Sequence, residues 1–433
     1  MASFEAEAWD VSTDSPKREL VADAAAAEAL VASLPATCRA IKLSNKSYAA
    51  PAAKALAATL AKLRGLEDVD VSDVIAGRPE DEALEVLSVL SQALATAAGG
   101  GDAAAATHTA LDVSDNALGQ KGLDALAPLF AGRAPLKVLK TCNNGMSAAA
   151  AAQLKDLLGD ATSLETFHYF NNMSGDGGAE AVAKIVEASP KLVDVRFSGT
   201  RAGRPGSLVF AKALKPRSLL RRVDLVDNTF GAEGGAALGA WLADVEAPLL
   251  ESLNVRDCML GDDGFAPLAA QLAKCSRLQA LELGGNELTA ESCAASWLAG
   301  VPALETLGME ENELGSAGAA ALAKALRSLE NGLPKLAAAK FATSEIASRG
   351  ALALAAALVD AAPALAALDL NENALSEDAL AKLDGLLAAA GKGEALQSME
   401  DNDEDLADDD ELEDDGDDDL AGLGAALSRA GIN

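Results

Sequence analysis

The chain has 433 residues, of which 50% are hydrophobic and 23% are charged, and its net charge is −31. This composition predicts a globular, soluble protein, and the excess of carboxylates excludes nucleic acid as a partner, because phosphates would be repelled. No run reaches the roughly 18 apolar residues of a membrane span. The five cysteines form no Cys-x-x-Cys pair, which indicates a reducing compartment and buried thiols.

Residues 1–35 precede the first repeated segment. The opening sequence MASFEAEAWDVSTDSPKREL has neither a basic start nor an apolar stretch, so we expect no secretory signal. The alanine-rich run 19–34 predicts a helix. We expect residues 1–35 to form a helical cap that covers the apolar end of the repeats.

A repeated pattern of apolar residues organises the chain from residue 36 to residue 398. It is clearest as L-x-x-L-x-L-x-x-N at 220–228, and it returns at 278–288, 304–315 and 365–375. This is the leucine-rich-repeat pattern, in which a polar residue anchors the turn that follows a short strand. The anchor positions, spaced by 26 to 32 residues from Asn116 onward and by 28 residues between the first two, are Lys46, Val74, Asn116, Asn144, Asn172, Thr200, Asn228, Cys258, Asn286, Asn312, Ser344 and Asn373.

The repeat length leaves room for a full helix after each strand. We therefore predict an α/β fold: a leucine-rich-repeat solenoid of eleven or twelve units, shaped as a crescent like that of ribonuclease inhibitor. Parallel strands should line the inner face and helices the outer face.

The end of the chain is strongly acidic. From Glu400 to Asp419, 15 of the 20 residues are acidic and none is basic. We expect residues 399–420 to be a disordered tail, because their charges repel one another. The last residues, 421–433, predict a short amphipathic helix.

Groups that could catalyse a reaction are few. The two histidines are His108, expected in the core, and His168, expected on the concave face. Neither has a second ligand at metal spacing, and no phosphate-binding loop or nucleophile motif is present. What remains is a polar surface on a rigid scaffold, which favours recognition of another protein.

Several segments resemble the Ran GTPase-activating proteins, particularly those of plants and algae. The most specific is VDVSDVIAGRPEDEALEVL at 69–87, with its D-[IV]-x-x-G-R motif, and the resemblance continues at 110–122, 170–186 and 223–238. It covers about residues 36–433. The plant targeting domain with its Trp-Pro-Pro mark is not seen, since Trp9 precedes Asp, so the layout is similar to the compact fungal form. This implies a cytoplasmic or perinuclear location.

The resemblance implies that the chain is not itself an enzyme. It would be a monomer that binds the GTP form of the GTPase Ran and accelerates GTP hydrolysis, an effect on the order of 10⁵ for such activators. It would need no cofactor, because Ran holds GTP and Mg²⁺, and Ran-binding proteins would be further partners.

The resemblance also implies which residues act. The family's Asn-Asn-Gly motif falls at 143–145, so Asn143 would orient the catalytic Gln of Ran, in place of an arginine finger. Arg78 would support catalysis, the alternative being a structural ion pair with Glu80 or Asp81. The expected partner-binding residues are Asp115, Lys140, His168, Asn171 and Arg201.

Two other classes of function compete with this interpretation. A passive scaffold of the ribonuclease-inhibitor type would carry the same repeats and bind a different protein. A hydrolase with its own active site is disfavoured, because the sequence offers no nucleophile with a matching base.

Overall fold

A computed structural model describes most of the chain. The described residues are 8–12, 18–99, 108–117, 119–130, 136–159, 162–215, 217–294, 296–402 and 423–432. They divide into two compact units, Met1–Ala213 and Leu214–Asn433. Both units are built from the same repeat of strand, turn and helix, which confirms the predicted α/β leucine-rich-repeat solenoid.

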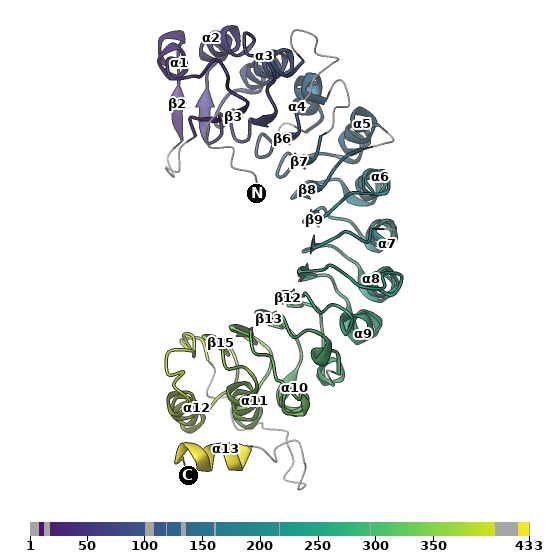
Figure 1. Ribbon diagram of the computed structural model, residues 1–433, viewed down its shortest axis with the longest axis vertical. Helices are drawn as coiled ribbons and strands as arrows, with labels where there is room; N and C mark the ends of the chain where they lie inside the picture. The colour runs from purple at the N-terminus through teal and green to yellow at the C-terminus, as the bar shows by residue number, and fades with distance from the viewer. Residues whose placement is uncertain are drawn as a thin grey trace. The chain divides into compact units, whose positions relative to one another are not determined.

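In the first unit, a parallel sheet runs in chain order and helices cover one side of it (Figure 1). The sheet contains β1 (Ala8–Asp10), β3 (Ala40–Lys42), β5 (Asp68–Asp70), β6 (Ala110–Asp112), β7 (Val138–Lys140), β8 (Thr166–Phe170) and β9 (Asp194–Ser198). A smaller parallel pair joins β2 (Glu19–Val21) to β4 (Lys46–Tyr48). The helical segments are α1 (Ala24–Val31), α2 (Ala50–Leu60), α3 (Glu80–Ala98), α4 (Gly119–Leu126), η2 (Ala127–Phe130), α5 (Ala148–Leu158), α6 (Gly175–Glu187) and α7 (Arg204–Leu214).

The second unit repeats the arrangement. Its parallel strands are β10 (Arg222–Asp224), β11 (Ser252–Asn254), β12 (Ala280–Glu282), β13 (Thr306–Gly308), β14 (Ala338–Lys340) and β15 (Ala367–Asp369). The helical segments are α8 (Gly231–Ala243), α9 (Gly261–Leu272), η3 (Ala290–Cys293), η4 (Ser296–Gly300), α10 (Gly315–Ser328), α11 (Ser348–Ala361), α12 (Glu377–Ala389) and α13 (Leu423–Ala430). Within the described residues, no helix is both long and apolar enough to cross a bilayer.

Each anchor residue is buried, as the spacing predicted. The asparagine anchors hydrogen-bond the backbone of neighbouring repeats. Asn144 donates its Nδ2 to the carbonyl of Val113 at 3.1 Å, and its Oδ1 accepts from the backbone N–H of Asn116 at 3.0 Å. The backbone N–H of Asn144 donates in turn to Oδ1 of Asn172 at 3.2 Å. These bonds satisfy polar groups that the turn leaves without a partner inside the core.

The residue before each anchor has a left-handed backbone. The φ angle is positive at all twelve positions, which are Asn45, Asp73, Asp115, Asn143, Asn171, Gly199, Asp227, Asp257, Gly285, Glu311, Thr343 and Glu372. Glycine, asparagine and aspartate tolerate this conformation best, and they fill nine of the twelve positions. The turn thus buries the anchor and directs the preceding side chain outward in most repeats.

The N-terminal segment differs from the expected helical cap. The helix predicted over 19–34 is confined to α1, and its first residues form β2 instead. The side chain of Asp23 accepts from the N–H of Ala26 and so starts the helix there. Strand β1 pairs with β3, with Trp9 buried, so the segment also extends the sheet.

The acidic tail expected at 399–420 lies outside the described residues beyond Asn402. The described part ends in contact with the last repeat, where Nδ2 of Asn402 donates to the carbonyl of Leu375 at 2.8 Å. Helix α13 lies within the range 421–433, and Arg429 in it forms an ion pair with Asp360 of α11 at 2.8 Å.

A charge placed in the core directly after β12 should destabilise the fold. Leu283 is fully buried, so Leu283→Asp should lower the free energy of unfolding by several kcal/mol, because the carboxylate would be buried without a partner. Urea unfolding followed by circular dichroism measures this. The control Leu283→Met keeps the volume and should cost under about 1.5 kcal/mol; equal stability of the Asp variant and the native chain would contradict the burial.

Removing one anchor should also be costly. Asn144→Ala should lower the free energy of unfolding by about 1–3 kcal/mol, because the N–H of Asn116 loses its partner in the core and the carbonyl of Val113 keeps only Nδ2 of Asn116. The exposed helix residue Lys184 gives a control, Lys184→Ala, that should change stability by less than about 0.5 kcal/mol. Equal melting temperatures for the two variants would argue against the anchor role.

Candidate functional site

Three exposed side chains in the first unit form a hydrogen-bonded row, here called the edge ladder: Asp115, Asn143 and Asn171. They occupy the left-handed position of three successive repeats, and all three are exposed. Nδ2 of Asn143 donates to Oδ1 of Asp115 at 2.9 Å. Nδ2 of Asn171 donates to Oδ1 of Asn143 at 2.9 Å. The amide of Asn143 is therefore held from both sides while it still faces solvent.

The two adjacent asparagines of the Asn-Asn-Gly motif have opposite surroundings. Asn144 is 5% exposed and bonds the core backbone, whereas Asn143 is exposed at the edge. This matches the expectation from the anchor spacing. The left-handed φ of Asn143, 54°, adds a constraint that the sequence did not reveal. Alanine there would be strained by about 1–2 kcal/mol, so glycine is the cleaner substitution.

In the first unit, the strands carry a second row of polar residues. Lys140 of β7 pairs with Asp112 of β6 at 3.4 Å. Nε2 of His168 on β8 lies 3.0 Å from Oδ1 of Asp194 on β9, and the guanidinium of Arg196 stacks 3.8 Å over the ring of Phe170. Parallel pairing places Lys140 beside His168. The predicted partner-binding residues Lys140 and His168 thus lie on neighbouring strands and do not belong to the edge ladder.

A hollow of about 390 Å³ lies over β1, β3, β5, β6 and β7, the first strands of this sheet. Sequence reasoning did not single out its acidic lining. Burial raises the pKa of both Asp68 and Asp70 above the ordinary value, and neighbouring carboxylates add to this. The lining includes both charge signs, from Asp10, Lys42, Asp68, Asp70, Asp112 and Lys140. Such a surface suits charged groups of a protein partner more than a small apolar ligand.

Arg78 lies in the turn after β5. Its Nη1 is 3.7 Å from Oε2 of Glu82, and its Nε is buried without a hydrogen-bond partner among the described residues. The predicted structural alternative, an ion pair of Arg78 with Glu80 or Asp81, is therefore wrong. The ion-pair partner of Arg78 is Glu82, and Glu80 pairs with Lys121. Arg78 lies in the turn just before α3, and its partner Glu82 lies in the first turn of that helix.

Of the other residues predicted from the sequence, Arg201 is at the surface and His108 is in the core. Arg201 is exposed with φ 58°, directly after the anchor Thr200. His108 is buried, as expected, and its Nε2 contacts the carbonyl of Leu129; burial lowers its pKa. Arg18 was not foreseen. It pairs with Asp73, which holds the same left-handed position as the edge-ladder residues, two repeats before Asn143.

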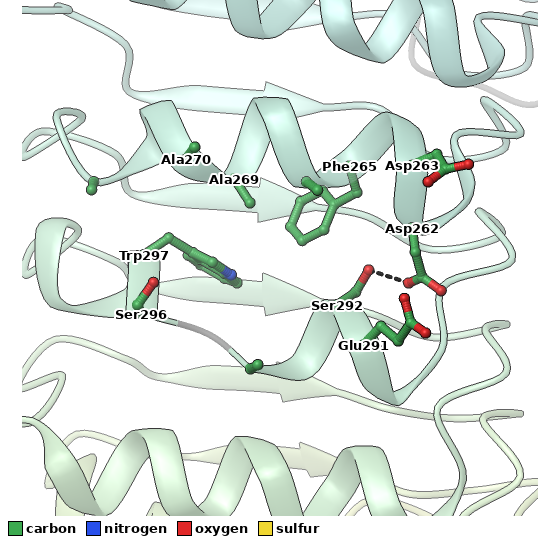
Figure 2. Close-up of a pocket in the computed structure, with 12 residues that line it drawn as sticks. Asp262, Asp263, Phe265, Ala269, Ala270, Glu291, Ser292, Ser296 and Trp297 are labelled. Atoms are coloured by element: carbon green, nitrogen blue, oxygen red, sulfur yellow. Dashed lines mark hydrogen bonds between the residues drawn. The ribbon is translucent and has the colours of Figure 1, made fainter.

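The second unit has a hollow of its own, of about 330 Å³, between α9 and the short helices η3 and η4 (Figure 2). Ser292 donates to Asp262 there. Burial acts to raise the pKa of Asp262, but hydrogen bonds from Ser292 and Thr289 outweigh it and lower the pKa. Asp262 is therefore a weak base. Across the described residues, no cluster of three or more His, Cys, Asp or Glu side chains could hold a metal ion.

Comparison with known proteins is consistent with the repeat architecture. The chain matches the family described as Leucine Rich repeat at residues 109–127, 218–239 and 247–269. It is 25% identical over 228 residues to the ribonuclease inhibitor of Sus scrofa, which covers 51% of this chain and 50% of that protein.

Two further relatives carry one description. The chain is 43% identical over 91 residues to the RAN GTPase-activating protein 1 of Arabidopsis thaliana, covering 21% of this chain and only 15% of that protein. It is 27% identical over 303 residues to the Ran GTPase-activating protein 1 of Saccharomyces cerevisiae, covering 64% of this chain and 72% of that protein. The chain is therefore a leucine-rich-repeat protein that is related by sequence to the Ran GTPase-activating proteins.

Proposed function

We propose that this protein stimulates GTP hydrolysis by Ran and that Asn143 orients the catalytic Gln of the GTPase. The observation that carries the mechanism is the edge ladder, which holds an exposed, uncharged amide between two neighbours. The relation to proteins named as Ran GTPase activators supports the choice of partner.

An amide is suited to this task. It offers an N–H donor and a carbonyl acceptor side by side, and another primary amide is its complement. Asn143 carries no charge, so it would act by holding the attacking geometry rather than by neutralising phosphate charge. Catalysis would thus take place in the active site of the GTPase, where GTP and Mg²⁺ are bound, and this chain would need no cofactor of its own.

Arg78 would contribute from the repeat region before the edge ladder. Its side chain is 21% exposed, and its one ion-pair partner, Glu82, lies at 3.7 Å. A guanidinium left partly unpaired is available to a carboxylate or a carbonyl of the partner. The strand residues Lys140 and His168, together with Arg201, would add contacts to the bound GTPase.

A second candidate is a passive scaffold that binds a protein without changing its chemistry. The similarity to ribonuclease inhibitor over half of this chain favours it. Single-turnover hydrolysis of GTP by purified Ran, with and without this protein, separates the two functions. Acceleration supports the activator, whereas binding without acceleration supports the scaffold.

The exposed amide should matter for the rate and not for the fold. Asn143→Gly should slow stimulated single-turnover hydrolysis by at least about tenfold, equivalent to roughly 1.4 kcal/mol of barrier, because the Gln would lose its holder. Glycine tolerates the left-handed backbone, so the melting temperature should stay close to that of the native chain. Affinity for Ran in its GTP form, measured by titration calorimetry, should change little. A normal rate in this variant would remove Asn143 from the mechanism.

Arg78 can be tested through its shape as well as its charge. Arg78→Ala should reduce stimulated hydrolysis by at least about tenfold with an unchanged circular dichroism spectrum. Arg78→Lys keeps the charge but loses the planar fork, so it should be defective too if two-point contacts are needed. Full activity of Arg78→Ala would make Arg78 a turn residue. The matched control Glu82→Gln removes its present ion-pair partner and should retain activity.

A further inference from the structure

We infer that Asp115 and Asn171 are positioning residues that fix which way the amide of Asn143 faces. This inference rests on the proposed function, because it concerns the group that would meet the catalytic Gln. It gives the two residues a role different from direct contact with the partner.

The carboxylate of Asp115 permits only one orientation of the Asn143 amide in the edge ladder. A carboxylate is ionised at neutral pH when exposed and then only accepts hydrogen bonds. The group of Asn143 that lies 2.9 Å from Oδ1 of Asp115 must therefore be the nitrogen. The oxygen of Asn143 then lies on the other side, where it needs a donor, and Nδ2 of Asn171 supplies one at 2.9 Å. The charge at one end thus sets the sense of the whole row.

The backbone holds the three side chains in equivalent places. The φ angles of Asp115, Asn143 and Asn171 are 63°, 54° and 51°. The backbone N–H of each donates to the following repeat, at 2.9, 2.7 and 2.9 Å respectively. The same geometry in three repeats stacks the side chains at the spacing of neighbouring strands, so the edge ladder follows from the repeat and not from a chance contact.

The fixed sense decides what the partner meets. With one N–H bonded to Asp115 and one lone pair bonded to Asn171, Asn143 keeps one N–H and one lone pair for solvent. These two groups can bind another primary amide through two hydrogen bonds, in one arrangement only. A reversed amide would put the acceptor where the donor should be, and the Gln would face an acceptor with its own oxygen.

The experiment reverses the orientation of the Asn143 amide without changing the amino-acid composition of the chain. Asp115→Asn removes the carboxylate, and Asn171→Asp places one on the opposite side of Asn143. The double variant Asp115→Asn/Asn171→Asp has the same net charge and the same number of ladder hydrogen bonds, but the nitrogen of Asn143 must now face position 171. Both residue types tolerate a left-handed backbone, so neither exchange strains the turn.

We expect the double variant to retain the native melting temperature and affinity for Ran in its GTP form. Its stimulated single-turnover rate should fall at least tenfold, to the level of Asn143→Gly. Asp115→Asn alone should lose less, because its amide can hold Asn143 in either sense. A native rate in the double variant would overturn the inference, since the sense of the amide would then be irrelevant.

Two controls separate this inference from the proposed function. Glu372→Gln alters a comparable edge pair in the second unit, where Oγ1 of Thr343 donates to Glu372 at 3.0 Å, and should leave the rate unchanged. Nitrogen-15 NMR of the Asn143 side-chain NH₂, assigned by its loss in Asn143→Gly, reports the ladder without Ran. If the native protein fails to accelerate hydrolysis, the proposed function is wrong. The inference then fails only if this signal is unmoved in the double variant.

Discussion

The hydrogen bonds from the buried asparagine anchors to the backbone of neighbouring repeats are the interaction on which most of the repeats depend. A chain that turns sharply inside a core leaves carbonyl and N–H groups without partners, at a cost of about 1–3 kcal/mol each. Asn286 shows how one side chain removes this cost, since its Nδ2 donates to the carbonyls of Val255, Leu283 and Gly284 at 2.8 to 3.0 Å. Where the anchor is Cys258 or Ser344, a smaller side chain performs part of this task.

The same turn creates the surface that a partner would meet. The anchor is directed inward after a left-handed residue, and in most repeats that residue is more exposed than the anchor. In successive repeats these outward positions come close enough for hydrogen bonds between side chains. The edge ladder in the first unit is therefore a by-product of the core geometry. Stability and recognition are carried by adjacent residues with different duties, Asn144 inside and Asn143 outside.

In each unit, the sheet face carries ion pairs between side chains of different strands. In the first unit, Asp112 pairs with Lys140 and Asp194 contacts His168, each across neighbouring strands. In the second unit, Lys340 of β14 forms an ion pair with Glu282 of β12 at 2.8 Å. Exposed ion pairs contribute little to stability, about 0–1 kcal/mol, but they fix the positions of charges that a partner can detect.

The sequence by itself determined the repeat and its register, because apolar spacing and an anchor residue in each repeat, polar in all but one, decide which residues are buried. It also separated Asn143 from Asn144. It did not reveal the strand at 8–10, since these three residues precede the repeats and show no strand pattern until β3 offers them a partner. Nor did it foresee the pairing of Arg78 with Glu82, the pairing of Arg18 with Asp73, or the acidic hollow at Asp68 and Asp70. These features join residues from different repeats or join a turn to the following helix, and only the tertiary structure decides which side chains meet.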